Sequence, residues 1–121
     1  MDKSKLLYVD DEQVNLQLFK FNFQKQFDII LVNSAVEALN AIQQNDIRVI
    51  ITDLKMPQMN GVELVNKIKE QYPEKCCIML SAYHLQEALN MGLDENSISA
   101  YITKPWKRET ILNAINKALE E

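Results

Sequence analysis

The sequence lacks the features that mark membrane and secreted proteins. No apolar run approaches the roughly 20 residues that a membrane span needs. The apolar run that follows the first five residues is too short for a signal peptide, and no cleavage site comes after it. We therefore expect a cytoplasmic protein without a membrane partner.

Cysteine, histidine and excess positive charge are also scarce. The two cysteines, Cys76 and Cys77, are adjacent, so they build no disulfide framework and are expected as small buried residues. The single histidine, His84, has no second histidine or cysteine at metal-binding spacing. The net charge is 13 − 17 = −4. This balance argues against direct nucleic-acid binding, which relies on a basic surface.

What remains is an ordinary globular composition, with 47% hydrophobic and 25% charged residues in a chain of 121. That length predicts one domain over residues 1–121. Five short apolar runs are continuous rather than alternating, which is typical of parallel strands buried on both faces. They span residues 6–9, 29–32, 49–51, 77–80 and 100–102.

Helical patterns separate these runs. The first is expected over residues 12–26, and the second and third begin with the capping-box pairs Ser34/Glu37 and Asn60/Glu63. Five repeats of strand and helix predict an α/β fold. The chain length and right-handed crossovers favour a flavodoxin-like (βα)5 doubly wound sheet, with its five parallel strands in the order 2-1-3-4-5.

Ligands of such sheets bind at the carboxyl ends of the strands. Asp10 and Asp11 follow the first run, Asp53 the third, Ser81 the fourth and Lys104 the fifth. Three carboxylates that lie close together repel one another, and Mg²⁺ relieves that repulsion. A metal, an ammonium and a hydroxyl together suit the handling of a phosphoryl group, which a carboxylate can itself accept.

The same positions carry a resemblance to a known family. Four segments of the chain closely resemble the receiver domain of two-component response regulators, and the resemblance spans essentially the whole chain. They are residues 7–12 (LYVDDE), 53–61 (DLKMPQMNG), 80–82 (LSA) and 101–106 (YITKPW).

The resemblance implies a phosphorylation-dependent switch and assigns roles to the matched positions. Asp53 is the implied phosphoacceptor, which takes its phosphoryl group from a phosphohistidine of a sensor histidine kinase or a histidine phosphotransfer protein. Ser81 and Lys104 are the implied catalytic partners of Asp53, because they would bind phosphoryl oxygens. The implied Mg²⁺ ligands are Asp10 (through water), Asp11, Asp53 and the carbonyl of Lys55.

The resemblance also implies how the signal leaves the site. Ser81 and Tyr101 would move together and change the surface formed by the fourth helix, fifth strand and fifth helix. An effector domain, an output protein or a phosphorylation-dependent homodimer would read that surface. The Lys104-Pro105 bond is expected to be cis. Such a protein catalyses only its own phosphorylation and dephosphorylation, so we do not expect an enzyme with an external substrate.

Other functions remain open on the residues alone. A phosphatase with an aspartate nucleophile would want Asp-x-Asp after the first strand, whereas Asp10 and Asp11 are adjacent. An FMN carrier would need a loop rich in Ser, Thr and Gly at the same place. A receiver fold that serves only as an interaction module, without phosphorylation, is the main alternative.

The first helix carries apolar residues on two nearly opposite faces. Leu16 and Phe19 belong to the face that is expected to cover the sheet, whereas Leu18 and Phe21 lie nearly opposite. The second face either packs on the last helix or forms an exposed patch that contacts the phosphodonor.

Overall fold

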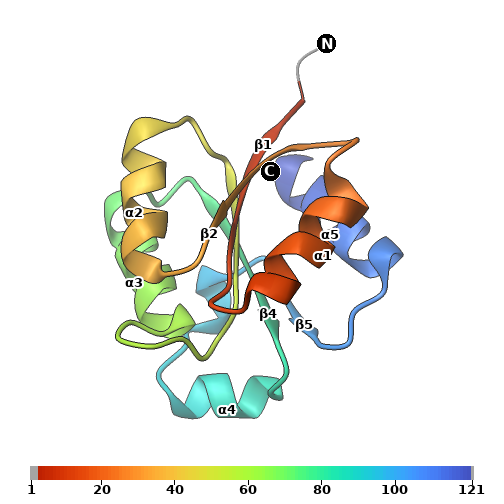
Figure 1. Cartoon of the computed structure of the whole chain (residues 1–121). Helices are drawn as coiled ribbons and strands as arrows, with labels where there is room; N and C mark the ends of the chain where they lie inside the picture. Colours follow the sequence, from red (N-terminus) through yellow and green to blue (C-terminus); the bar gives the residue numbers. More distant parts are fainter. Residues whose placement is uncertain (1–2, 121) are drawn as a thin grey trace.

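Five parallel strands form one sheet in the order β2-β1-β3-β4-β5, as the sequence predicts (Figure 1). The computed structural model describes residues 3–120. Each predicted run lies within one residue of an observed strand boundary at both ends. The strands are β1 (Lys5–Val9), β2 (Asp28–Val32), β3 (Val49–Thr52), β4 (Cys76–Ser81) and β5 (Ala100–Thr103).

Helices cover both faces of the sheet (Figure 1). One apolar core lies beneath α1 and α5, and the other lies beneath α2, α3 and α4. None of the described helices is both long and apolar enough to cross a bilayer. The helices are α1 (Gln13–Phe23), α2 (Ala35–Gln44), α3 (Gly61–Gln71), α4 (Leu85–Asn90) and α5 (Arg108–Glu120), with a 3-10 turn, η1 (Glu95–Ser97), before β5.

Local sequence signals fix the starts of two helices. The Ser34 hydroxyl accepts the Glu37 N–H at the start of α2, and Asn60 and Glu63 form a full capping box at the start of α3. The expected extent of the first helix, residues 12–26, is wrong at its end. The helix stops at Phe23, whose carbonyl instead accepts the N–H groups of residues 26 and 27 in a tight turn.

The two cysteines are free, as expected. Cys77 is buried in β4 and Cys76 is half-buried. Burial raises the pKa of the Cys77 thiol to about 12, so it stays protonated and is a poor nucleophile at neutral pH.

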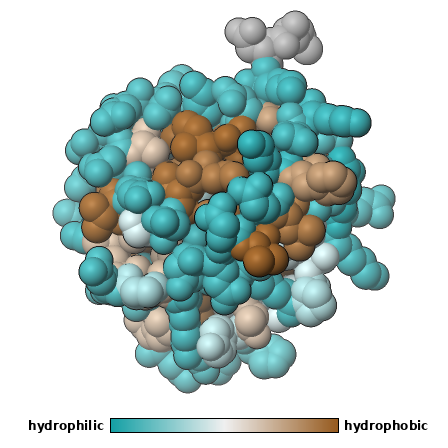
Figure 2. Space-filling model, in the orientation of Figure 1, coloured by the Kyte–Doolittle hydropathy of each residue, from teal (hydrophilic) through white to brown (hydrophobic). Residues whose placement is uncertain are grey.

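The two apolar faces of α1 differ in their burial. Leu16, Phe19 and Phe23 are buried against the sheet, whereas Val14, Leu18 and Phe21 are 76%, 50% and 77% exposed. The outward face therefore does not pack on α5. Apolar surface is visible on the face of the molecule that carries α1 and β2 (Figure 2).

Candidate functional site

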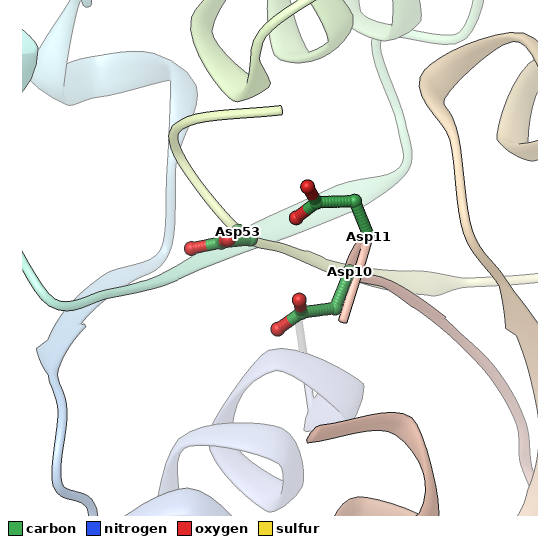
Figure 3. A group of neighbouring side chains, drawn as sticks. All are labelled: Asp10, Asp11 and Asp53. Atoms are coloured by element: carbon green, nitrogen blue, oxygen red, sulfur yellow. The ribbon is translucent and has the colours of Figure 1, made fainter. Parts of the chain in front are cut away.

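The ends of β1 and β3 bring three aspartates together. The Asp53 N–H donates to the carbonyl of Val9 at 3.0 Å, which ties the end of β3 to the end of β1. Asp10, Asp11 and Asp53 each offer a carboxylate oxygen, and these oxygens lie within 4.8 Å of one another (Figure 3). The predicted cluster of carboxylates is therefore present in the fold.

Asp10 is fully buried and is held by a set of donors that the sequence analysis missed. Its Oδ2 accepts the Tyr8 hydroxyl at 2.7 Å and the Asn15 side-chain amide at 3.1 Å. Its Oδ1 accepts the Glu12 N–H at 3.0 Å. Tyr8 and Asp10 are two residues apart along an extended chain, so their side chains point to the same side. Because a buried tyrosine hydroxyl needs a partner, this spacing was the available signal.

Lys104 supplies a cation between two of the carboxylates. Its Nζ lies 3.1 Å from Asp10 Oδ2 and 3.4 Å from Asp53 Oδ1. The Lys104 N–H donates to the Ser81 carbonyl at 2.7 Å, so the ends of β4 and β5 are joined. The Lys104-Pro105 bond is cis, as the resemblance implies. The ammonium thus lies where it can neutralise negative charge on Asp53.

The environment of Asp53 opposes its ionisation. Burial raises the pKa of the Asp53 carboxyl to about 6, the nearby Asp10 charge adds to this effect, and the Lys104 ammonium and the Leu54 N–H counteract it. At pH 7 the carboxylate is still mostly ionised. A destabilised anion beside a cation is the kind of group that gains from binding a second cation or from forming a bond at its oxygen.

Ser81 and Tyr101 hold the same peptide segment. The buried Ser81 hydroxyl accepts the Tyr83 N–H at 3.0 Å, and the Tyr101 hydroxyl donates to the Tyr83 carbonyl at 2.6 Å. Burial is the main cause that raises the pKa of Tyr101. The loop between β4 and α4 is therefore linked to the end of β4 through Ser81 and to β5 through Tyr101.

The side chain of Lys55 reaches across to α4. Its Nζ lies 2.5 Å from Glu87 Oε2 and 4.0 Å from the centre of the Tyr83 ring. The hydrogen bond with Glu87 raises the pKa of Lys55. The ammonium is engaged with α4 and the loop before it, which leaves the backbone carbonyl as the group that Lys55 could offer to a metal.

The donor set at the strand ends fits Mg²⁺. All of the candidate ligand atoms are oxygens, and Mg²⁺ binds through a few carboxylates and carbonyls while it keeps several waters. Asp10 is buried, Asp11 is exposed and Asp53 is intermediate, so the cluster opens to solvent on one side.

A groove extends from Lys104 along α1. It has a volume of about 630 Å³ and is lined by Leu18 and Asn22 from α1 and by Ala82, Lys104 and Trp106 from the two loops opposite. The exposed α1 face thus continues into the neighbourhood of the carboxylate cluster. A partner that covers the groove would contact both the exposed face of α1 and the neighbourhood of the carboxylate cluster.

Comparison with known proteins gives a consistent result. The family model described as "Response regulator receiver domain" matches residues 6–116. The chain is 29% identical to a "Chemotaxis protein CheY homolog" of Campylobacter jejuni over 120 residues, which is 95% of this chain and 92% of that protein. It is 27% identical to a crystallised signal receiver domain of an HD domain-containing protein from Pseudomonas fluorescens, with a TM-score of 0.91 and coverage of 98% and 95%.

Longer relatives contain the same unit as a part. The chain is 30% identical over 118 residues to the "Hydrogenase transcriptional regulatory protein HoxA" of Cupriavidus necator. That alignment covers 98% of this chain but only 24% of the relative, so the chain spans about a quarter of that protein.

Proposed function

The chain belongs to the response regulator receiver domain family, and on that premise we propose that it is a switch in which Asp53 accepts a phosphoryl group from a phosphohistidine. Receiver domains are signalling modules of two-component systems rather than enzymes that act on external substrates. The observation that carries the proposal is the position of Lys104, whose ammonium lies 3.4 Å from Asp53 Oδ1 beside two further aspartates.

The proposed reaction is a transfer between two nucleophiles. An oxygen of the Asp53 carboxylate forms a bond to phosphorus while the P–N bond to the partner's imidazole breaks. The imidazole leaves with the electron pair of that bond and takes up a proton. Lys104 binds one of the equatorial oxygens and Ser81 donates a hydrogen bond to another, which stabilises the charge there.

A magnesium ion completes the proposed site. Asp11, Asp53 and the carbonyl of Lys55 would bind it directly, and Asp10 would bind it through water. When bound, Mg²⁺ neutralises the carboxylates and the incoming phosphoryl oxygens. The catalysis is limited to the protein's own phosphorylation and dephosphorylation.

The two bonds to Tyr83 support a route from the site to the surface. Phosphorylation adds about −1.5 to −2 charge at neutral pH and attracts the Ser81 hydroxyl. Movement of Ser81 displaces the Tyr83 backbone, whose N–H it binds, and Tyr101 follows because its hydroxyl donates to the carbonyl of the same residue. The surface of α4, β5 and α5 then changes, and an effector domain, an output protein or a second copy reads it.

The exposed face of α1 supports a docking role for the phosphodonor, a sensor histidine kinase or a histidine phosphotransfer protein. We expect Leu18→Glu to slow transfer from such a donor by about tenfold or more, because it puts a charge in place of an apolar side chain that the docked donor would cover. Phosphorylation by acetyl phosphate should be unchanged, because so small a donor needs no docking surface. Transfer reactions that are stopped at successive times and resolved by gel electrophoresis measure the rates with both phosphodonors.

Val36→Glu is the matched control for this prediction. Val36 is 51% exposed, against 50% for Leu18, and it lies on α2 at the other face of the sheet. Both rates should stay at the wild-type value in the control. Equal slowing of Leu18→Glu with both donors would mean that the site itself is disturbed, and no slowing with either would remove the docking role of α1.

Intact mass spectrometry tests the central proposal. Wild type incubated with acetyl phosphate and Mg²⁺ should gain one phosphoryl group, and the gain should disappear when EDTA replaces Mg²⁺. Asp53→Asn should gain none, because the amide is a poor nucleophile. The variant should still fold, because its Oδ1 can accept the hydrogen bonds from Leu54 and Lys104.

The outcomes separate the switch from its main alternative. An adduct that persists in Asp53→Asn would place the acceptor elsewhere. If wild type accepts no phosphoryl group from acetyl phosphate or from a histidine kinase, the receiver fold serves as an interaction module without phosphorylation.

A further inference from the structure

A buried tyrosine hydroxyl lies beneath the carboxylate cluster and is not used in the reaction described above. Tyr8 is 1% exposed in β1, and its hydroxyl donates to Asp10 Oδ2 at 2.7 Å. We propose that Tyr8 is a positioning residue that orients the Asp10 carboxylate for Mg²⁺ binding. The inference rests on the proposed metal site and adds a residue that does not touch the metal but hydrogen-bonds one of its ligands.

The other donors to Asp10 cannot replace this hydroxyl equally well. Lys104 bonds the same Oδ2 at 3.1 Å but also Asp53, and it is the group expected to turn to the phosphoryl oxygen. Asn15 lies on α1, is only partly buried and also contacts Glu12 at 3.5 Å. When Lys104 moves, Tyr8 is the fully buried neutral donor that stays on Oδ2.

Packing fixes the position of the Tyr8 ring. It stacks on Phe19 with the ring centres 4.3 Å apart, and Phe19 contacts Phe23 at 4.8 Å. Both phenylalanines are 0% exposed. Tyr8 also lies between Leu31 of β2 and Ile51 of β3 in the sheet, so neither its backbone nor its ring has room to shift. A donor on so rigid a support defines the direction of the Asp10 carboxylate.

Hydrogen bonds of this kind have a known effect on metal sites. Outer partners fix the orientation of metal-binding groups, and their loss typically weakens metal affinity by about 10- to 100-fold. The proposed water-mediated contact of Asp10 places Tyr8 one step further from the metal, so the lower end of that range applies.

The test is a Mg²⁺ titration of Tyr8→Phe by isothermal titration calorimetry. This change removes one oxygen and keeps the stacked ring, so we expect the protein to fold and its Mg²⁺ dissociation constant to rise about tenfold. Trp106 gives a second, fluorescent readout, because its ring centre lies 6.4 Å from that of Phe19. Tyr72→Phe is the control, because it removes a tyrosine hydroxyl at the end of α3, beside the start of β4 rather than its carboxyl end, and should leave the affinity unchanged.

Unfolding by urea in EDTA separates positioning from stability. A Tyr8→Phe protein that unfolds more easily but binds Mg²⁺ within twofold of wild type would show a structural role only and overturn the inference. Failure of wild type itself to bind Mg²⁺ would instead overturn the metal site of the proposed function, and the inference with it. Binding by wild type and by Tyr72→Phe with a tenfold loss in Tyr8→Phe is the expected result.

Discussion

Replacing Gly61 with alanine is expected to destabilise the protein by roughly 3 kcal/mol or more, because the new methyl group has no space. A Cβ at this position would lie 2.2 Å from the backbone carbonyl oxygen of Asp53 and 3.1 Å from both Leu54 Cα and Met79 Sδ. The Gly61 N–H donates to the Leu54 carbonyl at 2.7 Å, so the start of α3 cannot retreat without losing that bond. Urea unfolding followed by circular dichroism measures the change.

The other glycine of the chain provides the control. Gly92 has φ +100°, and a Cβ there would meet nothing within 4 Å. Gly92→Ala therefore carries only the cost of a left-handed backbone, about 1–2 kcal/mol. A smaller loss for Gly61→Ala than for Gly92→Ala would contradict the close approach of α3 to the Asp53 backbone. The same close approach explains why a glycine stands eight positions after Asp53.

The strand ends were predictable because parallel strands impose a simple rule. Once five apolar runs alternate with helices, residues that follow the runs must meet at one edge of the sheet. That rule brought Asp10, Asp53 and Lys104 together from positions up to 94 residues apart. The strand order followed in the same way from right-handed crossovers and chain length.

Contacts that depend on side-chain direction were harder to predict. The engagement of Lys55 with Glu87 requires the position of α4 relative to the loop after β3, which no local pattern encodes. The end of α1 at Phe23 was missed because residues 24–26 (QKQ) contain no glycine or proline to mark a stop. Whether the Leu18 face is exposed could not be predicted without the position of α5, because periodicity shows a second apolar face but not what covers it.

Removing the Lys104 charge should separate phosphorylation from metal binding. We expect Lys104→Met to slow phosphorylation by acetyl phosphate by about 100-fold or more, because a preorganised cation no longer stabilises the phosphoryl oxygens. Mg²⁺ should bind at least as tightly as to wild type. The ammonium lies 3.1 Å and 3.4 Å from carboxylates of Asp10 and Asp53, and it competes with any second cation for their charge.

Lys107→Met is the charge-matched control for this pair of measurements, because Lys107 is exposed three residues further along the chain. Its phosphorylation rate and Mg²⁺ affinity should equal those of wild type. If Lys104→Met lost metal affinity together with rate, the ammonium would be needed to hold the carboxylates in place rather than to bind the phosphoryl group. A slower phosphorylation together with an unchanged or tighter Mg²⁺ affinity is the result expected if the lysine and the metal compete for the same carboxylates. The distances from the Lys104 ammonium to Asp10 and Asp53 are the observation behind this expectation.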